Sequence, residues 1–287
     1  MIQTVLKVAL WIMVFVIGMA VLAVAGVWTV SSLKINEKFT APAIQIRHST
    51  DPAIMAEGAR IATVTGCNGC HGARMQGNVF AELPDGTRLT APNLPRVAST
   101  YADEDLARAI RHGVRSNGRG VLAMPSEAFF SLTDDDLLAI LSHIRATPDE
   151  GGDLPNTRLG LMARFFLASG EFKTAPRYID DMAKRPTYDF SDPVARGLYL
   201  ATIACSECHG LDFKGRSYGE EFSPPDLIVG SAYSLDQFRT LMKTGVGTNG
   251  RDLRLMSEVA QTRFSSFTDD EIDSLHAFIT HRALTIK

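Results

Sequence analysis

The chain has 287 residues, a formal net charge of −3 at pH 7 and only four cysteines. This length predicts more than one domain. The regions 51–150 and 185–287 each carry more acidic than basic residues, which excludes the strongly basic face that nucleic-acid binding requires. Nucleic acid is therefore not an expected partner.

An apolar segment lies near the N-terminus. Residues 8–30 contain no charged side chain, and a helix of that length spans about 35 Å, enough to cross a hydrocarbon core of about 30 Å. We predict a transmembrane anchor at 1–33, followed by a linker at 34–50. A cleaved signal peptide with its cleavage sequence at 23–25 is the alternative, but the apolar run continues beyond that point.

Two C-x-x-C-H motifs contain all the cysteines, the first at residues 67–71 and the second at 205–209. This pattern is the attachment signal for covalent haem, in which the histidine binds the iron. It predicts two covalently bound haem c groups. Zinc held by four cysteines is an alternative, but it does not explain a histidine in the same place twice. A redox dithiol is another, but no βαβ pattern supports it. The predicted covalent attachment residues are Cys67, Cys70, Cys205 and Cys208, and the predicted proximal ligands are His71 and His209.

The second motif lies in an internal repeat of the region around the first, which predicts two domains of the same kind. Residues 113–119 and 245–251 both read G-V-x-x-N-G-R, and further matches lie on either side of them. We predict one haem domain at 51–150, an interdomain segment at 151–184 and a second haem domain at 185–287.

Each copy of the repeat has the signals of three main helices. The first helix begins at an Asp-Pro pair, at 51–52 and at 192–193, where the aspartate serves as N-cap and proline occupies the first turn. Strand signals are few, so the predicted fold class is all-α, with an N-terminal transmembrane helix followed by two helical domains. The middle helices are expected at 102–112 and 234–244, and the closing helices from Thr133 and Thr268.

A second axial ligand of each iron should recur in both copies, whereas a core residue need not. Met124 and Met256 both lie six residues after the glycine of the Asn-Gly turn. Met75 and Met242 have no methionine at the equivalent position of the other copy, so they are interpreted as packing residues. The predicted axial pairs are therefore His71 with Met124 and His209 with Met256.

Two further pairs recur near the motifs. Pro92 and Pro225 lie in equivalent loops, and their carbonyls are expected to orient the proximal histidines through the second ring nitrogen. Arg119 and Arg251 also recur, either as partners of haem propionates or as exposed turn residues.

The interdomain segment contains an apolar stripe formed by Leu159, Met162 and Phe166. We expect this stripe to pack between the two domains, with docking on a partner protein as the alternative. We expect the domains to be held together, because electron exchange between two irons requires a short separation.

The wording around the first motif is close to one known family. The strings EGARIATVTGCNGCHGARMQG, APNL, AIRHGV and LAMPSEAFFSLTDDDLLAILSHIRA resemble class I c-type cytochromes, and the likeness covers 50–147 and 187–283. They are most similar to the cytochrome subunits of membrane-bound periplasmic dehydrogenases for alcohols and aldehydes. Those subunits usually carry three haem domains and often a C-terminal membrane attachment, whereas this sequence shows two motifs and an N-terminal apolar segment.

The resemblance implies an electron-transfer subunit that is not itself an enzyme. It implies a catalytic partner with a molybdenum, flavin or quinone cofactor, and passage of electrons to quinone or a terminal oxidase in a periplasmic respiratory chain. Because haem c is attached outside the bacterial cytoplasmic membrane, we expect a single-pass protein with a cytoplasmic N-terminus and periplasmic haem domains.

Two other functions are compatible with these motifs. One is a tethered electron shuttle, or a fixed subunit, between a quinol-oxidising complex and a terminal oxidase, similar in layout to the diheme subunit of cbb3-type oxidases. The other is a diheme peroxidase or a thiosulfate dehydrogenase. A peroxidase needs one iron with an open position, which two recurring methionines disfavour.

Overall fold

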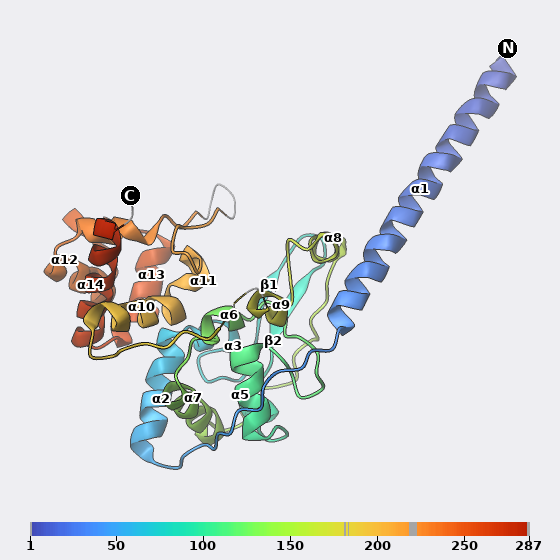
Figure 1. Ribbon diagram of the computed structural model, residues 1–287. Coiled ribbons are helices and arrows are strands. Elements are labelled where there is room, and N and C mark those ends of the chain that lie inside the picture. The colour runs from blue at the N-terminus through green and yellow to red at the C-terminus, as the bar shows by residue number, and fades with distance from the viewer. Residues whose placement is uncertain (1, 181, 183, 218–222, 286–287) are drawn as a thin grey trace.

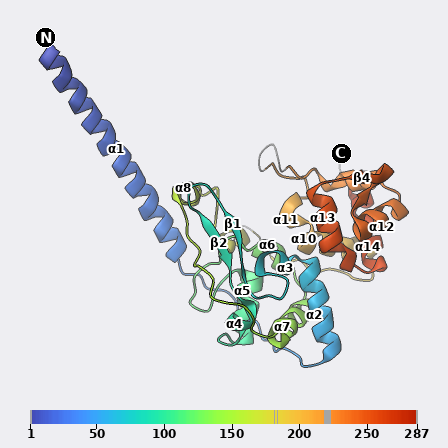
Figure 2. The same cartoon turned by 180° about the vertical axis from the view of Figure 1, so that it is seen from behind.

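The protein has a long N-terminal helix and two helical lobes (Figures 1 and 2). We call residues 52–146 the first lobe and residues 193–285 the second lobe. The predicted all-α fold class is confirmed, because helices form almost all of the regular structure. The computed structural model describes residues 2–180, 182, 184–217 and 223–285.

Helix α1, Ile2–Asn36, extends away from the lobes and exposes its apolar side chains along most of its length (Figure 1). Its hydropathy and length are sufficient to cross a membrane. It is longer than the uncharged segment that predicted it, since the last turns remain helical and pack against another helix, α8.

The first lobe contains six helices and one pair of strands among its residues, all of which the structure describes. They are α2 Pro52–Val64, α3 Cys67–His71, β1 Asn78–Glu82, β2 Arg88–Ala91, α4 Leu94–Ala98, α5 Asp103–His112, α6 Ser126–Phe129 and α7 Asp134–Ala146.

The second lobe repeats the order of the main helices, with short 3₁₀ turns in its connections, but its described strand pair lies between α12 and α13 rather than after the motif turn. Its described elements are α10 Pro193–Ala204, α11 Ser206–His209, η1 Leu227–Ala232, α12 Leu235–Thr244, β3 Val246–Gly247, η2 Thr248–Gly250, β4 Arg251–Asp252, α13 Leu255–Thr262, η3 Phe264–Ser266 and α14 Asp269–Thr285.

The predicted helix starts are confirmed by their caps. The side chains of Asp51 and Asp192 accept hydrogen bonds from backbone nitrogens two residues later, at 2.8 and 2.9 Å. Thr268, the predicted start of the closing helix, forms a capping box with Glu271 at the start of α14. The middle helices α5 and α12 each end at a glycine in the left-handed conformation.

In each lobe the first helix crosses the last helix at a glycine. A Cβ on Gly58 of α2 would lie 1.8 Å from the Ala139 carbonyl oxygen of α7. A Cβ on Gly197 of α10 would lie 1.9 Å from the Ser274 carbonyl oxygen of α14. Only glycine permits this approach of two backbones, and the crossing positions the end of the first helix, where the cysteine motif begins.

The β1–β2 hairpin was not predicted. Its strands pair antiparallel, and the turn between them contains Pro84, Asp85 and Gly86. This triplet is a turn signal between two short runs of strand-forming residues, so the hairpin could have been predicted from the sequence.

The segment between the lobes forms α8, Leu161–Ser169, and α9, Ala175–Ile179. The expectation that its apolar stripe packs between the lobes is wrong. Helix α8 packs against the C-terminal part of α1, and Met162 and Phe166 are exposed, whereas Leu159, before the start of α8, is buried. The hydrophobic contact between the lobes is made instead by α2, α6, α10 and η3, and one buried apolar cluster runs through both lobes.

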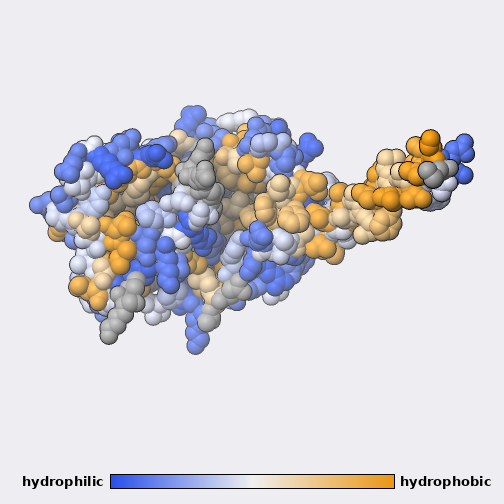
Figure 3. All heavy atoms as spheres, turned by 90° about the horizontal axis from the view of Figure 1, so that it is seen from above, coloured by the Kyte–Doolittle hydropathy of each residue, from blue (hydrophilic) through white to orange (hydrophobic). Residues whose placement is uncertain are grey.

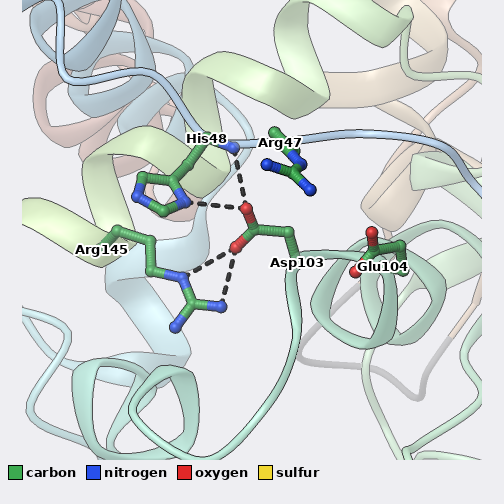
Figure 4. Close-up of a pocket in the computed structure, with 5 residues that line it drawn as sticks. All are labelled: Arg47, His48, Asp103, Glu104 and Arg145. Atoms are coloured by element: carbon green, nitrogen blue, oxygen red, sulfur yellow. Dashed lines mark hydrogen bonds and ion pairs between the residues drawn. The ribbon is translucent and has the colours of Figure 1, made fainter.

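The connection from α1 to the first lobe is fastened by an aspartate (Figure 4). Asp103 accepts hydrogen bonds from the backbone nitrogen of His48 at 2.9 Å and lies 2.7 Å from its Nδ1. The same carboxylate pairs with Arg145 at 2.7 Å. Burial acts to raise the pKa of Asp103, but the bonds from His48 and Arg145 outweigh it and hold this pKa below its usual range.

We expect Asp103→Asn to destabilise the first lobe in a pH-dependent way. Because the folded-state pKa of Asp103 is depressed, its contribution is present above the unfolded pKa of about 4 and is lost as the pH falls below it. Chemical denaturation at pH 7 should show a loss of about 1–3 kcal/mol in the free energy of unfolding, which shrinks in acid. Glu104→Gln, in the same surface pocket, is the charge-matched control, and an equal loss there would contradict the assignment.

Candidate functional site

The two cysteine motifs form short helical turns at the ends of α2 and α10. In the first lobe the chain bends at Gly66, whose φ of 78° is left-handed, and α3 then carries both cysteines and His71. In the second lobe α11 follows directly on Cys205. The four cysteines all lie in the described residues, and no two of them form a disulfide bond.

The histidine of each motif is oriented by a proline carbonyl. Nδ1 of His71 lies 2.9 Å from the Pro92 oxygen, and Nδ1 of His209 lies 2.8 Å from the Pro225 oxygen. Nδ1 therefore carries the proton, and Nε2 keeps its lone pair for a metal. Burial lowers the pKa of both histidines, and the proline carbonyls only partly oppose this effect. The structure thus holds both imidazoles neutral.

The residues after each motif have the same backbone path in both lobes. Met75 and Phe213 have φ values of 58° and 59°, and both side chains are buried in the core. Their carbonyls accept hydrogen bonds from Leu94 and Leu227 at 2.9 and 2.8 Å, which ties the motif to the proline loop. Met75 is therefore placed as a packing residue.

The second lobe contains a cavity of about 720 Å³ beside its motif, a volume typical of cofactor pockets. Met256, the second residue of α13, lines the cavity together with His209. Met242 lines it too, from the buried face of α12. The structure therefore leaves two methionines facing this cavity, of which the internal repeat singles out Met256.

In the first lobe, Met124 lies in the loop before α6. It follows Ala123, whose φ is 59°, and precedes Pro125. Its side chain is partly buried and packs against the core. Met124 is the only methionine in residues 113–125, and it lies between a residue with a positive φ and a proline.

The cysteines do not gather into a zinc site. Among the described residues, no group of three or more histidine, cysteine, aspartate or glutamate side chains lies close enough to hold a metal ion. Burial raises the pKa of Cys70 to about 11 and that of Cys205 to about 12.

Comparison with known proteins identifies the family of the domain that contains the first motif. The sequence profile of the cbb3-type cytochrome c oxidase subunit III matches residues 53–144. The chain is a c-type cytochrome.

It is homologous to the cytochrome c subunits of membrane-bound dehydrogenases. It is 26% identical over 255 residues to the fructose dehydrogenase cytochrome subunit of Gluconobacter japonicus, covering 78% of this chain and 52% of that protein. It is 29% identical over 222 residues to the cytochrome c subunit of the quinone-dependent alcohol dehydrogenase of Gluconobacter oxydans, covering 70% and 46%. It is 27% identical over 267 residues to the gluconate 2-dehydrogenase cytochrome c subunit of Pantoea cypripedii, covering 79% and 59%. This cytochrome spans about half the length of these curated relatives.

The second-lobe cavity fits haem c. Cys205 and Cys208 lie on its wall beside His209, and the remaining lining is mainly apolar, with Leu241 and Ile279 among its residues. Thiols placed next to a neutral imidazole in an apolar cavity are the donor set that covalent haem requires.

The recurring arginines differ in their surroundings. Arg251 is exposed and lines the second-lobe cavity. Arg119 is half-buried in the loop after α5, where its backbone forms a bridge with Lys38. A role of either arginine as a partner of a haem propionate therefore stays a prediction.

An arginine links the two haem-attachment turns of this cytochrome. Arg263, between α13 and η3, donates from Nε and Nη2 to the Val64 oxygen at 3.3 Å, and its Nη1 lies 3.1 Å from Glu207. Val64 ends α2, just before the first motif, and Glu207 lies inside the second motif. Its guanidinium also fills the space beside Gly66, where a Cβ would lie 2.4 Å from Cζ. The two turns are therefore neighbours in space.

Two more contacts hold the lobes in this arrangement. Arg60 of α2 makes a bidentate ion pair with Glu271 of α14, at 2.7 and 2.9 Å. The hydroxyl of Tyr199 on α10 donates to Asp136 and accepts from the backbone nitrogen of Thr133. The expectation that the lobes are held together is met by buried polar contacts rather than by the interdomain segment.

Sequence reasoning missed Arg263 as a site residue. The repeat places Phe129 at the equivalent position of the first copy, so the search for recurring residues passed over it. A search for differences between the two copies could have found it, because Arg263 is a charged residue at the position where the first copy has the buried aromatic Phe129.

We expect Arg263 and Glu207 to shift the haem potentials in opposite directions. A positive charge disfavours the oxidised iron, which carries one more positive charge than the reduced iron. Arg263→Gln should therefore lower the potentials and Glu207→Gln should raise them, each on the order of 1 kcal/mol for a charge near the surface. Spectroelectrochemical titration of the holoprotein measures both. Arg88→Gln, in a surface pair with Glu82, is the control, and shifts of the same sign in Arg263→Gln and Glu207→Gln would contradict the expectation.

Proposed function

We propose that the chain is a membrane-anchored diheme cytochrome c that transfers electrons in a periplasmic respiratory chain as a subunit of a membrane-bound dehydrogenase. The observation that carries this proposal is the adjacency of the two haem-attachment turns, bridged by Arg263. Two haems held by neighbouring turns can exchange electrons directly, and this role requires no substrate pocket in the chain. The relatives support the same role, because each is the cytochrome subunit of a dehydrogenase.

The haem-binding residues follow from the repeat and from the geometry of the turns. When bound, haem c supplies reversible one-electron exchange, and the protein supplies the ligands, the apolar surroundings and the spacing. The proline carbonyls fix the imidazole planes, and a thioether ligand raises the potential relative to a second imidazole. We assign Cys67, Cys70, His71 and Met124 to the first haem, Cys205, Cys208, His209 and Met256 to the second haem, and Pro92 and Pro225 to the orientation of the histidines.

Helix α1 is proposed to remain as an anchor. The supporting observation is that the uncharged run continues past the candidate cleavage sequence at 23–25 and ends only at Leu33. The base of the helix is joined to the fold, since Arg164 of α8 bonds Ser31 at 2.9 Å and stacks 3.8 Å from the Trp28 ring centroid. In this arrangement the N-terminus is cytoplasmic, the helix crosses the membrane once, and both lobes are periplasmic.

The thioether assignment in the second lobe is testable against a matched methionine. Met256→Ala should abolish the sulfur-to-iron charge-transfer band of one haem, about half of the total band, and lower that haem's potential. Met242→Ala removes the same side chain from the same cavity and should keep the band. A band that disappears in Met242→Ala and persists in Met256→Ala would overturn the assignment. Met124→Ala should remove the other half.

A second candidate is a subunit linked to a terminal oxidase. The match of residues 53–144 to the cbb3-type oxidase subunit III favours it. A diheme peroxidase or thiosulfate dehydrogenase has no comparable support, since the relatives described above are electron-transfer subunits.

Co-purification with a functional readout distinguishes the partners. We expect the protein, extracted from its native membrane in mild detergent, to retain a dehydrogenase catalytic subunit, and its haems to become reduced when an alcohol, aldehyde or sugar substrate of that subunit is added. Haems that are reduced only by quinol, together with a retained oxidase, would support the second candidate instead. Peroxide turnover by the isolated chain would contradict both.

A further inference from the structure

Helix α8 presents an exposed apolar face. Leu161, Met162, Phe165 and Phe166 are 48%, 54%, 50% and 39% exposed. Positions three and four apart are neighbours on a helix surface, which joins Leu161 to Phe165, Met162 to Phe166 and Met162 to Phe165, so these four side chains form a single patch. On the other side of the helix, Leu167 is only 1% exposed. Helix α8 therefore buries one face in the protein and leaves an apolar face outward.

This helix is fixed against the base of α1. The guanidinium of Arg164 lies 3.8 Å from the Trp28 ring centroid and donates to Ser31 and Ser32 at 2.9 and 3.2 Å. Lys34 donates to the Ala168 carbonyl near the end of α8 at 3.0 Å. These bonds place α8 at the level of residues 28–34 of α1.

The first lobe fixes the other end of α8. The carboxylate of Asp85, in the β1–β2 turn, accepts hydrogen bonds from the backbone nitrogens of Met162 and Ala163 at 3.0 and 3.4 Å. The N-terminus of α8 is thereby capped from the hairpin, while its C-terminal end is held by α1. The patch cannot turn inward without breaking both sets of bonds.

The level of α8 on α1 is the level of the membrane boundary. The uncharged run of α1 ends at Leu33, and Lys34 and Lys38 follow. Tryptophan and lysine concentrate where a membrane-spanning helix leaves the hydrocarbon, as Trp28 and Lys34 do here. A helix bonded to these residues lies in the boundary between headgroups and acyl chains.

We propose that α8 is an interfacial helix that inserts Leu161, Met162, Phe165 and Phe166 into the outer boundary of the lipid bilayer. A helix lying in the membrane plane with one apolar, aromatic face has the properties of an interfacial helix. The inference rests on the proposed retention of α1 as an anchor, and it adds a second contact that fixes the height and tilt of the first lobe.

Lipid fits this patch better than a protein because the patch continues the lipid-facing surface of α1. Figure 3 shows hydrophobic surface extending from α1 onto the adjoining part of the body. Leu83, 49% exposed, lies two residues before the capping Asp85. The other strongly exposed apolar side chains described outside α1 belong to separate elements and form no comparable run along one helix: Leu154, Phe190, Val229, Val246, Leu255 and Leu284.

Site-directed spin labelling of the full-length holoprotein tests this contact. All four native cysteines lie in the haem motifs, so a cysteine introduced elsewhere is the single free thiol once haem is attached. Met162→Cys and Phe165→Cys report on the patch, and Val14→Cys reports on the middle of α1. Phe190→Cys is the matched control, because Phe190 is an exposed aromatic residue, 46% exposed, before α10. Each variant is labelled and placed in phosphatidylethanolamine–phosphatidylglycerol vesicles, and its accessibility to oxygen and to a water-soluble nickel chelate is measured.

The expected result is an oxygen-to-nickel accessibility ratio at residues 162 and 165 that is several-fold higher than at 190 and lower than at 14. A ratio at 162 and 165 equal to that at 190, with residue 14 in lipid, would overturn the inference and leave the anchor intact. An aqueous signal at residue 14 would overturn the anchor and the inference together. Shielding of 162 and 165 from both reagents would show a protein contact and overturn the assignment to lipid.

Discussion

The hydrogen bond between each proximal histidine and a proline carbonyl is the constraint on which the rest of the site depends. It fixes the tautomer, so that Nε2 of His71 and His209 is the nitrogen available to iron. It also closes the loop after each motif onto the motif itself, and the backbone bonds of Met75 and Phe213 complete that closure. An iron-binding imidazole on a five-residue turn would otherwise rotate freely. With both loops closed, the orientation of each imidazole is set by its loop.

The same principle of fixed geometry governs the pair of lobes. Arg263 reaches from the second lobe to the backbone beside the first motif, and Arg60 reaches from the first lobe to the cap of α14. Because these charged groups are partly buried, removing one partner would leave the other unsatisfied, so the lobes are held in one relative position. That position brings together the two turns that hold the haems. The arrangement serves a protein that passes electrons between two centres, and it places one positive charge where it acts on both.

The membrane end of the molecule is organised by a second set of contacts. Helix α1 is joined to the first lobe through His48 and Asp103, and to α8 through Trp28 and Arg164. A flexible tether would let the lobes sample many heights above the bilayer, whereas these contacts fix the first lobe relative to α1. A partner embedded in the same membrane, or quinone within it, would then meet the lobes in a defined orientation.

The sequence by itself determined the elements that follow from local chemistry. The two C-x-x-C-H motifs, the capped helices starting after Asp51 and Asp192, and the uncharged run in α1 depend on neighbours a few residues apart, and the internal repeat supplied an independent comparison. Only the tertiary structure decided which distant residues meet. Arg263 lies beside Gly66 although 197 positions separate them, and the apolar stripe of α8 faces outward beside α1 rather than between the lobes. No local pattern encodes these contacts, because they arise from the way whole helices pack.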